Sequence, residues 1–257
     1  MILAIDIGNT NIVLGGCRGD EIVFRERLST VRTATVLEYT ALLKTAFEMN
    51  GVSPGEIDGA ILSSVAPGVT GTMKAAVEKF LHITPLIVGP GIKTGLRIQI
   101  DNPAQLGSDM VVAAVAGVQQ YPLPLILIDM GTATTLSVVD KTGTFRGGMI
   151  LPGVTVSHDA LIRETAQLQR VAFDVPKTLI GRNTADCMKS GLLYGSAGAL
   201  DGLIDRIHLE LGEPCTAVAT GGLANLIAPL CRNKILVDDD LLLSGLVLLY
   251  NKNKPSE

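Results

Sequence analysis

The chain has 257 residues, enough for one large domain or two of ordinary size. Hydrophobic residues make up 47% and charged residues 18%, which indicates a folded core rather than disorder. Aromatic residues are only 4%, and the net charge of −4 comes without a basic stripe, so base stacking and a nucleic-acid surface are both disfavoured. The four cysteines and three histidines are scattered, so neither a disulfide framework nor a zinc site is expected.

Two segments bear on secretion and membranes. The N-terminus has no basic region and Asp6 interrupts its apolar run, so no signal peptide is predicted. The uncharged stretch from Met110 to Ile128 is nearly long enough to span a bilayer, but Pro122 and Pro124 divide it into a helix and a strand. The sequence therefore predicts a cytoplasmic protein without a membrane partner.

The first half of the chain begins with three predicted strands joined by tight turns. The turns fall at Gly8-Asn9-Thr10 and at Arg18-Gly19-Asp20. Apolar residues near helical spacing then predict a helix over 35–50, which ends at Gly51. Strands and helices alternate through the rest of this half, and they are expected at 59–65, 70–82, 85–88 and 106–118.

The same pattern then starts again. Strands are predicted at 123–129, 134–140 and 144–150, and helical segments at 154–169 and 184–211. A strand follows at 217–220, and a Gly-Gly turn at 221–222 leads into a helix. Another strand is predicted at 235–237 and a final helix at 240–250. The polar tail, 251–257, is expected to fray.

The restart is visible in the residues themselves. Asp6 and Asp129 lie 123 residues apart, and at that offset Ile2–Gly8 aligns with Leu125–Gly131 without a gap. Each segment is an apolar strand that ends in Asp-x-Gly. Two such turns at equivalent places predict a duplicated α/β architecture with a cleft between the halves, residues 1–120 and 121–257.

An Asp-x-Gly turn at the end of a strand suits a phosphate. Glycine lets the backbone approach closely, the N–H groups face the anion, and Thr or Asn side chains add donors. The carboxylate would hold a cation that binds the phosphate. Two hairpins, at Gly8–Asn11 and Gly131–Thr135, would grip a polyphosphate from both sides, with Gly221-Gly222 near an adenosine. For either loop alone, an ordinary hairpin turn with capping residues remains open; the pair favours the phosphate.

Short motifs occur in order along the whole chain: DIGNTN (6–11), SSVAP (63–67), DNPAQLGSD (101–109), DMGTATT (129–135), GGMILPG (147–153), NT (183–184) and TGG (220–222). The arrangement resembles the superfamily of actin, sugar kinases and chaperone ATPases, and the motifs resemble those of type III pantothenate kinases. The resemblance implies a duplicated actin-like ATPase fold, with two βββαβα-type halves and a nucleotide cleft between them.

The resemblance also implies an activity and its partners. The γ-phosphoryl group of ATP would be transferred to the primary hydroxyl of pantothenate, giving 4'-phosphopantothenate in the first step of coenzyme A biosynthesis. Mg²⁺ with ATP, and K⁺ or NH₄⁺ as a monovalent cation, are the implied cofactors. The family's homodimeric state is expected here too. The apolar stretch 192–211 would suit a dimer, although it could equally be intramolecular core.

The family's functional residues map onto this chain by motif. The catalytic base maps onto Asp109, the monovalent-cation ligand onto Asp129, and a nucleotide contact of the second loop onto Thr132. The first phosphate loop maps onto Asp6, Ile7, Gly8, Asn9, Thr10, Asn11, Ile12 and Val13. The substrate-binding positions map onto Gly107, Ser108, Asp109, Met110 and Thr184.

Several of these residues have a plain structural alternative. Asp109 lies just inside the expected start of a helix, where the dipole favours any carboxylate. Asp6 could cap a turn, and Thr184 could be the N-cap of the helix that follows it. His158, on a helical stretch, is expected to lie on a solvated face, and Lys93 is expected on the surface.

Two positions depart from the family pattern. Met110 stands where the family has arginine, and Ile100 where it commonly has tyrosine. Both would line the pantothenate pocket, so the departures concern the substrate rather than ATP. A small-molecule kinase with another alcohol substrate, or a non-catalytic nucleotide-binding regulator, are therefore alternatives. The joint presence of Asp6, Asp109 and Asp129 weighs against the regulator.

Overall fold

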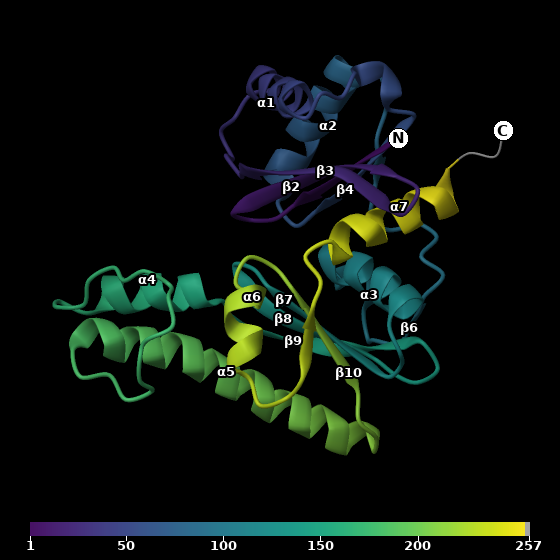
Figure 1. Ribbon diagram of the computed structural model, residues 1–257. Helices are drawn as coiled ribbons and strands as arrows, with labels where there is room; N and C mark the ends of the chain where they lie inside the picture. The colour runs from purple at the N-terminus through teal and green to yellow at the C-terminus, as the bar shows by residue number, and fades with distance from the viewer. Residues whose placement is uncertain (255–257) are drawn as a thin grey trace. The chain divides into compact units, whose positions relative to one another are not determined.

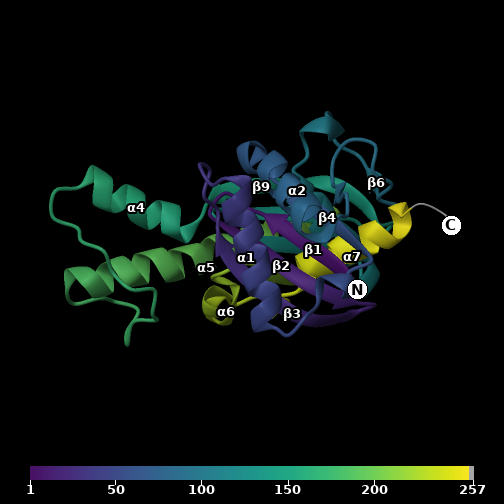
Figure 2. The ribbon, with the colours of Figure 1, turned by 90° about the horizontal axis from the view of Figure 1, so that it is seen from above.

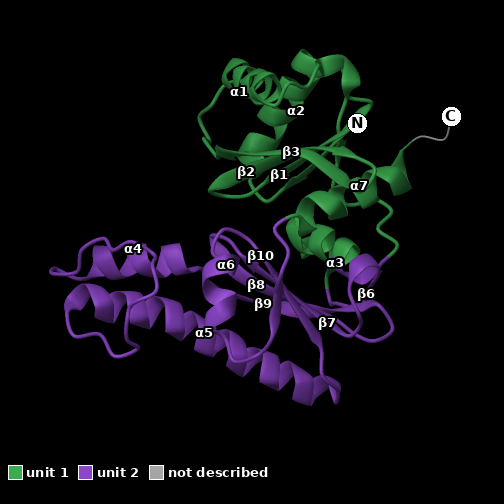
Figure 3. Ribbon diagram, viewed as in Figure 1, with its two compact units in different colours: residues 1–95, 102–116, 240–257 green, residues 96–101, 117–239 purple. Residues whose placement is uncertain are grey.

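The computed structural model describes residues 1–254 and divides them into two compact units (Figures 1 and 3). Unit 1 contains residues 1–95 and 102–116 together with the segment that starts at Asp240. Unit 2 contains residues 96–101 and 117–239. Each unit is described by itself below.

Among the described residues, unit 1 is built on a five-stranded sheet of order β3-β2-β1-β4-β5. Its strands are β1 (Ile2–Ile7), β2 (Asn11–Arg18), β3 (Glu21–Ser29), β4 (Gly59–Ser64) and β5 (Leu86–Ile87). β2 is antiparallel to β1 and β3, whereas β4 is parallel to β1 and β5. The three strands and two tight turns expected at the start of the chain are confirmed.

Helices cover both faces of this sheet. α1 (Val36–Met49) and α2 (Pro67–Leu81) pack together on one face and share the buried core with β1. α7 (Leu241–Asn253) contacts β1, β2 and β4 from the other face. The glycines of these strands permit the contact, because a Cβ at Gly15 or Gly59 would lie 2.7 Å from Leu243 or 1.9 Å from Tyr250. The division at residue 120 assigns α7 to the second half of the chain, but its packing places it in unit 1.

Unit 2 repeats the topology of unit 1. In the part of the chain that the structure describes, its sheet has the order β11-β10-β7-β8-β9-β6. The strands are β6 (Arg97–Ile98), β7 (Leu125–Met130), β8 (Ala133–Val139), β9 (Thr144–Pro152), β10 (Thr216–Thr220) and β11 (Ile235–Val237). β7 to β11 occupy the places of β1 to β5, with the same parallel and antiparallel pairs. The predicted duplication is therefore confirmed, and β6, which no sequence pattern predicts, adds an edge strand parallel to β9.

The long helix α5 (Thr184–Leu211) supplies most of the helical core of unit 2. α4 (Val154–Glu164) lies alongside its N-terminal half, as Figures 1 and 2 show. α6 (Ala224–Ile227) follows β10. α3 (Ser108–Gln120) begins in unit 1, and short 3₁₀ helices occur at Pro54–Glu56, Pro103–Gln105 and Ala228–Leu230.

Three predicted boundaries are wrong. α2 begins at Pro67 rather than at residue 70, because proline at the first helical position already has a helical φ. α4 ends at Glu164 rather than at 169. α7 continues through residues 251–253 of the expected frayed tail, where Asn253 Nδ2 donates to the carbonyl oxygens of Leu249 and Lys93 at 2.8 and 2.9 Å. Residues 255–257 of that tail lie outside the described residues.

None of the helices within residues 1–254 combines the length and the hydropathy needed to cross a membrane.

Candidate functional site

The turn between β1 and β2 is held by hydrogen bonds on both sides. The backbone N–H of Gly8 donates to the carbonyl oxygen of Asn11 at 2.9 Å, and a Cβ at Gly8 would lie 3.0 Å from that oxygen. From the segment after β3, Thr30 Oγ1 donates to the Gly8 carbonyl at 2.8 Å, and the Thr30 N–H donates to the Thr10 carbonyl at 2.9 Å. The turn is therefore braced, while Asn9 and Thr10 are exposed at its tip.

The expected first phosphate loop, 6–13, divides into exposed and buried parts. Ile7 and Ile12 are fully buried in the core of unit 1. Their side chains cannot contact a nucleotide, so any contact from these two positions has to come from the backbone. The tip between them carries the exposed polar side chains, those of Asn9 and Thr10.

Asp6 is the last polar residue of β1, and it is paired in register with Ser63 of β4. The pKa of Asp6 is raised to about 7, chiefly by burial of the carboxyl group and also by the negative charge of Asp109, while a hydrogen bond with Ser63 acts in the opposite direction. Ser63 also bonds Ser108, the residue directly before Asp109, at 3.0 Å, so the two carboxyl groups lie in the same region of unit 1. The structure thus brings together two of the predicted site residues from distant parts of the chain.

Asp109 lies in the first turn of α3. Its Oδ1 accepts a hydrogen bond from the backbone N–H of Met110 at 2.8 Å. A Cβ at Gly107 would lie only 2.4 Å from that oxygen, so glycine leaves the space that the carboxylate occupies. Burial raises the pKa of Asp109 above its ordinary value, although backbone hydrogen bonds oppose the shift. A half-buried carboxylate with a raised pKa is suited to accept a proton near neutral pH.

The raised pKa of Asp6 predicts a pH-dependent stability. Between about pH 4 and pH 7 the folded protein holds a proton on Asp6 that the unfolded chain releases, so this group lowers the stability as the pH rises through that range. We therefore compare the unfolding free energies of ligand-free Asp6→Asn and the native chain. Between pH 5 and pH 8 their difference should shift in favour of Asp6→Asn by on the order of 2 kcal/mol. Urea unfolding at the two pH values measures it.

The control for this measurement is Asp20→Asn, which removes an exposed carboxylate from the turn between β2 and β3. It should leave the pH dependence of unfolding unchanged. Equal pH dependence in Asp6→Asn and the native chain would show that Asp6 is already ionised in the folded protein at pH 5.

The turn between β7 and β8 is braced by glycines from distant motifs. The N–H of Gly153 donates to the Thr132 carbonyl at 3.1 Å, and a Cβ at Gly153 would lie 2.3 Å from that oxygen. Gly221 follows β10 with φ +96°, and a Cβ there would lie 2.6 Å from Oδ1 of Asp129. Asp129, Thr132, Gly153 and Gly221 are therefore gathered in unit 2, with Thr132 exposed.

Asp129 supplies one hard oxygen ligand at the second turn. Its Oδ1 lies 2.6 Å from the position of a Cβ on Gly221 and 3.6 Å from that of a Cβ on Gly131, so the two glycines let the backbone come close to the carboxylate. In the described part of the chain, no three His, Cys, Asp or Glu side chains converge on a metal site.

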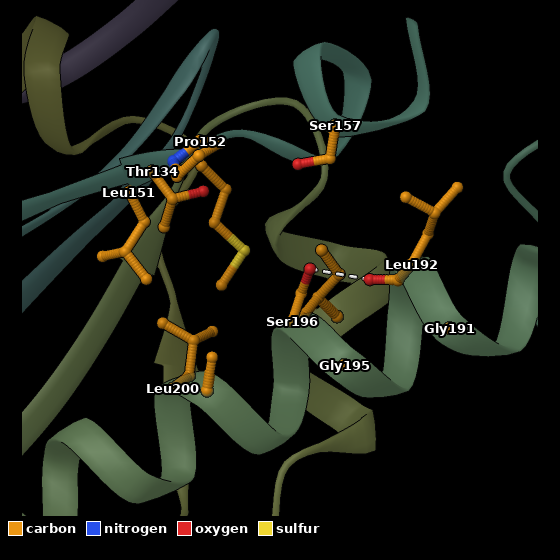
Figure 4. Close-up of a pocket in the computed structure, with 12 residues that line it drawn as sticks. Thr134, Leu151, Pro152, Ser157, Gly191, Leu192, Gly195, Ser196 and Leu200 are labelled. Carbon is orange, nitrogen blue, oxygen red and sulfur yellow. Dashed lines mark hydrogen bonds between the residues drawn. The ribbon is translucent and has the colours of Figure 1, made fainter. Parts of the chain in front are cut away.

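A pocket of about 240 Å³ lies behind this turn (Figure 4). Its walls come from the ends of β7, β8 and β9 and from α4, α5 and α6: Met130, Thr134, Leu151, Pro152, Ser157, Gly191, Leu192, Gly195, Ser196, Ala199, Leu200 and Ile227. Met130 and Thr134 are the pair that closes the β7–β8 hairpin. The lining has no charged side chain, so the pocket suits an uncharged group rather than a phosphate.

The remaining predicted residues are placed as follows. Thr184 is exposed at the first position of α5, and the N-cap is Asn183, whose Oδ1 accepts from the Asp186 N–H at 2.9 Å; the alternative of Thr184 as N-cap is wrong. Met110 is half-buried, with its Cγ 4.0 Å from the position of a Cβ on Gly107. Met110 thus lies against the loop that precedes α3.

His158 corrects another expectation. It is only 3% exposed rather than on a solvated face. Its Nε2 accepts a hydrogen bond from the N–H of Val171 at 3.1 Å, and its ring packs edge-on against Phe173 with centroids 5.2 Å apart. The residue fastens the segment after α4, which explains why the helix does not continue to residue 169.

Sequence reasoning assigned no role to the serines of the SSVAP motif or to Gly153, and it placed Gly221 near an adenosine rather than beside Asp129. Ser63 contacts Asp6 and Ser108, and Gly153 and Gly221 close around the second turn. Each belongs to a quoted motif, so a signal was present. Their roles depend on contacts between segments far apart in the chain.

Comparison with known proteins agrees with this layout. A type III pantothenate kinase from Exiguobacterium sp. (strain ATCC BAA-1283 / AT1b) is 44% identical over 254 residues, covering 99% of this chain and 100% of the relative. One from Pelobacter propionicus is also 44% identical over 254 residues, with 99% and 100% coverage.

A solved structure shares the fold. Component A of (R)-2-hydroxyglutaryl-CoA dehydratase from Acidaminococcus fermentans superposes with a TM-score of 0.59 at 15% identity, over 97% of this chain and 96% of that one. The duplicated actin-like fold implied by the sequence is confirmed. The family model for type III pantothenate kinases matches residues 2–206, and with the relatives above it shows that this chain belongs to the type III pantothenate kinase family.

Proposed function

We propose that this chain transfers the γ-phosphoryl group of ATP to pantothenate, giving 4'-phosphopantothenate and ADP in the cytoplasm. The observation that carries the proposal is that Asp109, at the start of α3, directly follows Ser108, whose hydroxyl is bonded to Ser63, the register partner of Asp6. In this chemistry most of the catalysis is positioning and charge neutralisation, and one base that orients the hydroxyl completes it.

The parts of the site have distinct roles in this proposal. Residues 6–13 of the first half, 1–120, and Thr132 of the second half, 121–257, bind the phosphates of ATP. The loop 107–110 and Thr184 contact pantothenate. Asp109 accepts the proton of the primary hydroxyl as its oxygen bonds to the γ-phosphorus, and the bond to the β,γ-bridging oxygen breaks to release ADP.

The direct test uses purified protein with ATP, Mg²⁺, K⁺ and a panel of small alcohols that includes pantothenate. Mass spectrometry should find phosphopantothenate and ADP in equal amounts. ADP without phosphopantothenate at any pantothenate concentration would exclude the proposed substrate. Phosphorylation of another alcohol in the panel would then identify a kinase with an altered substrate.

We further propose that Asp129 holds a K⁺ or NH₄⁺ ion, and that Asp6 faces the Mg²⁺ that accompanies ATP. These ions would neutralise the charge of the transferring phosphoryl group. The support for an ion of low charge is that Asp129 offers a single carboxylate at a turn where Gly131 and Gly221 let the backbone come close to it.

Activity should therefore depend on potassium or ammonium, with sodium a poor substitute, because a larger and more weakly hydrated ion binds a single carboxylate at a lower dehydration cost. The measurement is the initial rate with the chloride salts at matched ionic strength. Full activity in sodium-only buffer would remove the proposed role of Asp129.

A homodimer is the proposed oligomeric state. Several large apolar side chains of unit 2 are exposed: Leu161 (40%), Leu179 (61%), Ile180 (81%) and Leu209 (82%). Apolar side chains exposed at separate places on α4, on α5 and in the segment between them are candidates for contact with a second copy.

Met110 stands where the family has arginine, so Met110→Arg tests the substrate site. An arginine there would present a donor fork to a substrate carboxylate, whereas methionine offers an apolar contact. Because Met110 is half-buried against Gly107 rather than in the core, Met110→Arg should fold normally. We expect the pantothenate KM to stay the same or to fall, and Met110→Ala to raise it slightly. A large drop in melting temperature for Met110→Arg would place the side chain in the core instead.

A further inference from the structure

The hydroxyl of Ser108, the first residue of α3, is bonded to the end of β4 by three hydrogen bonds. Ser63 Oγ and the Ser64 N–H donate to Ser108 Oγ at 3.0 and 3.1 Å, and Ser108 Oγ donates to the Ser64 carbonyl at 3.0 Å. A serine hydroxyl has one donor and two acceptor positions. All three are used within the protein, so Ser108 can bind a substrate through its hydroxyl only by breaking one of these bonds.

The partner side of this connection is itself fixed. Ser63 is fully buried, and Ser64 Oγ accepts from Thr70 Oγ1 at 2.8 Å and from the Ala66 N–H at 3.2 Å. These bonds tie the end of β4 to the first turn of α2. Ser108 is therefore attached to a braced part of the sheet rather than to a loop.

The bond determines where the next residue lies. Ser63 is the register partner of Asp6, so a side chain bonded to Ser63 and Ser64 holds the start of α3 at the level of Asp6. Asp109 follows directly, and its Oδ1 occupies space that a Cβ on Gly107 would need, so the carboxylate packs against the backbone of the preceding loop. A small shift of this turn would move the carboxylate away from the reacting hydroxyl.

We propose that Ser108 is a positioning residue, which holds the Asp109 carboxylate beside Asp6 by fastening the first turn of α3 to the end of β4. The inference rests on the proposed role of Asp109 as the base. It assigns Ser108 a function through Asp109, in place of direct side-chain contact with pantothenate.

The rest of α3 does not depend on this bond. Val112, Ala114 and Ala116 are fully buried, so the helix stays packed when the hydroxyl is removed. Ser108→Ala should therefore fold, and should lower kcat by roughly 10-fold or more, because small misplacements of catalytic groups are costly. The KM values for ATP and pantothenate should change little. Ser108→Thr, which retains the hydroxyl, should recover most of kcat.

Thr45→Ala is the matched control. It removes a hydroxyl that donates to the backbone of its own helix, to Ala41 O at 2.9 Å on α1. It should leave kcat and both KM values unchanged. If Ser108→Ala does not fold, Ser108→Cys keeps the shape of the side chain, weakens its hydrogen bonds and serves the same comparison.

The deciding experiment is a double-mutant cycle with Asp109→Asn, whose residual turnover is measured at high enzyme concentration. If Ser108 acts through Asp109, Ser108→Ala should have no further effect on kcat in the Asp109→Asn background. An equal loss in both backgrounds, or a native kcat for Ser108→Ala alone, would overturn the inference. Native turnover in Asp109→Asn would instead refute the base, and absence of phosphopantothenate from the native protein would refute the proposed function.

Discussion

Asp109→Asn should lose most of the turnover, with kcat lower by about 10²–10⁴-fold, the usual contribution of a general base. The amide has the shape of the carboxylate and can still accept the Met110 N–H that now bonds Oδ1 at 2.8 Å. It cannot accept the proton of the substrate hydroxyl. The fold and the affinity for ATP should therefore remain close to those of the native chain.

The measurement combines steady-state kinetics with nucleotide binding by calorimetry. Asp20→Asn, at an exposed turn, controls for the loss of one negative charge and should retain native kcat. A native kcat in Asp109→Asn, with ATP binding intact, would reassign Asp109 to an N-terminal helix acid.

Gly153→Ala should disrupt the second phosphate turn. A Cβ at this position would lie 2.3 Å from the Thr132 carbonyl oxygen and 2.5 Å from that of Gly131. Both are backbone atoms, so the turn itself has to move, and the Gly153 hydrogen bond to Thr132 is strained or lost. Overpacking of this kind typically costs about 1–3 kcal/mol of unfolding free energy. The KM for ATP should rise because Thr132 is displaced.

The conformation of Gly153 does not explain this requirement. Its φ of −68° and ψ of 161° are accessible to any residue, so the effect comes from contact alone. Gly71→Ala is the control, since a Cβ there meets nothing within 4 Å on the exposed side of α2. It should stabilise the protein by up to about 1 kcal/mol through helix propensity. Native stability and a native ATP KM in Gly153→Ala would show that the turn adapts freely.

Local patterns were sufficient for most elements of this protein, although not for the edge strand β6. Alternation of apolar residues and Gly-containing turns predicted the opening strands, and the gapless alignment of Ile2–Gly8 with Leu125–Gly131 predicted that the topology would repeat. Such signals are local because each strand or helix buries its own apolar face, and they identify which residues face the core. The start of α5 at Thr184 and its end at Leu211 were predicted for the same reason.

The tertiary structure decided which distant residues meet. By its position in the sequence, α7 is the last element of the second half. It nevertheless packs on the sheet of unit 1, because Gly15 and Gly59 leave room for it there. The sequence predicts His158 on the surface. In the structure it is buried, and it accepts a hydrogen bond from the N–H of Val171, which lies beyond its helix. Neither outcome follows from periodicity, because each depends on the shape of a partner surface.

For the candidate site, too, the sequence predicted the important residues and the structure showed their contacts. The motifs marked Asp6, Asp109 and Asp129 as chemically important, because carboxylates at strand and helix ends beside glycines are suited to phosphates and cations. Only the folded chain showed that Asp109 raises the pKa of Asp6 and that the Ser108 hydroxyl is fully used by Ser63 and Ser64. Charge interactions and hydrogen bonds act over a few ångströms, and sequence separation carries no information about such distances.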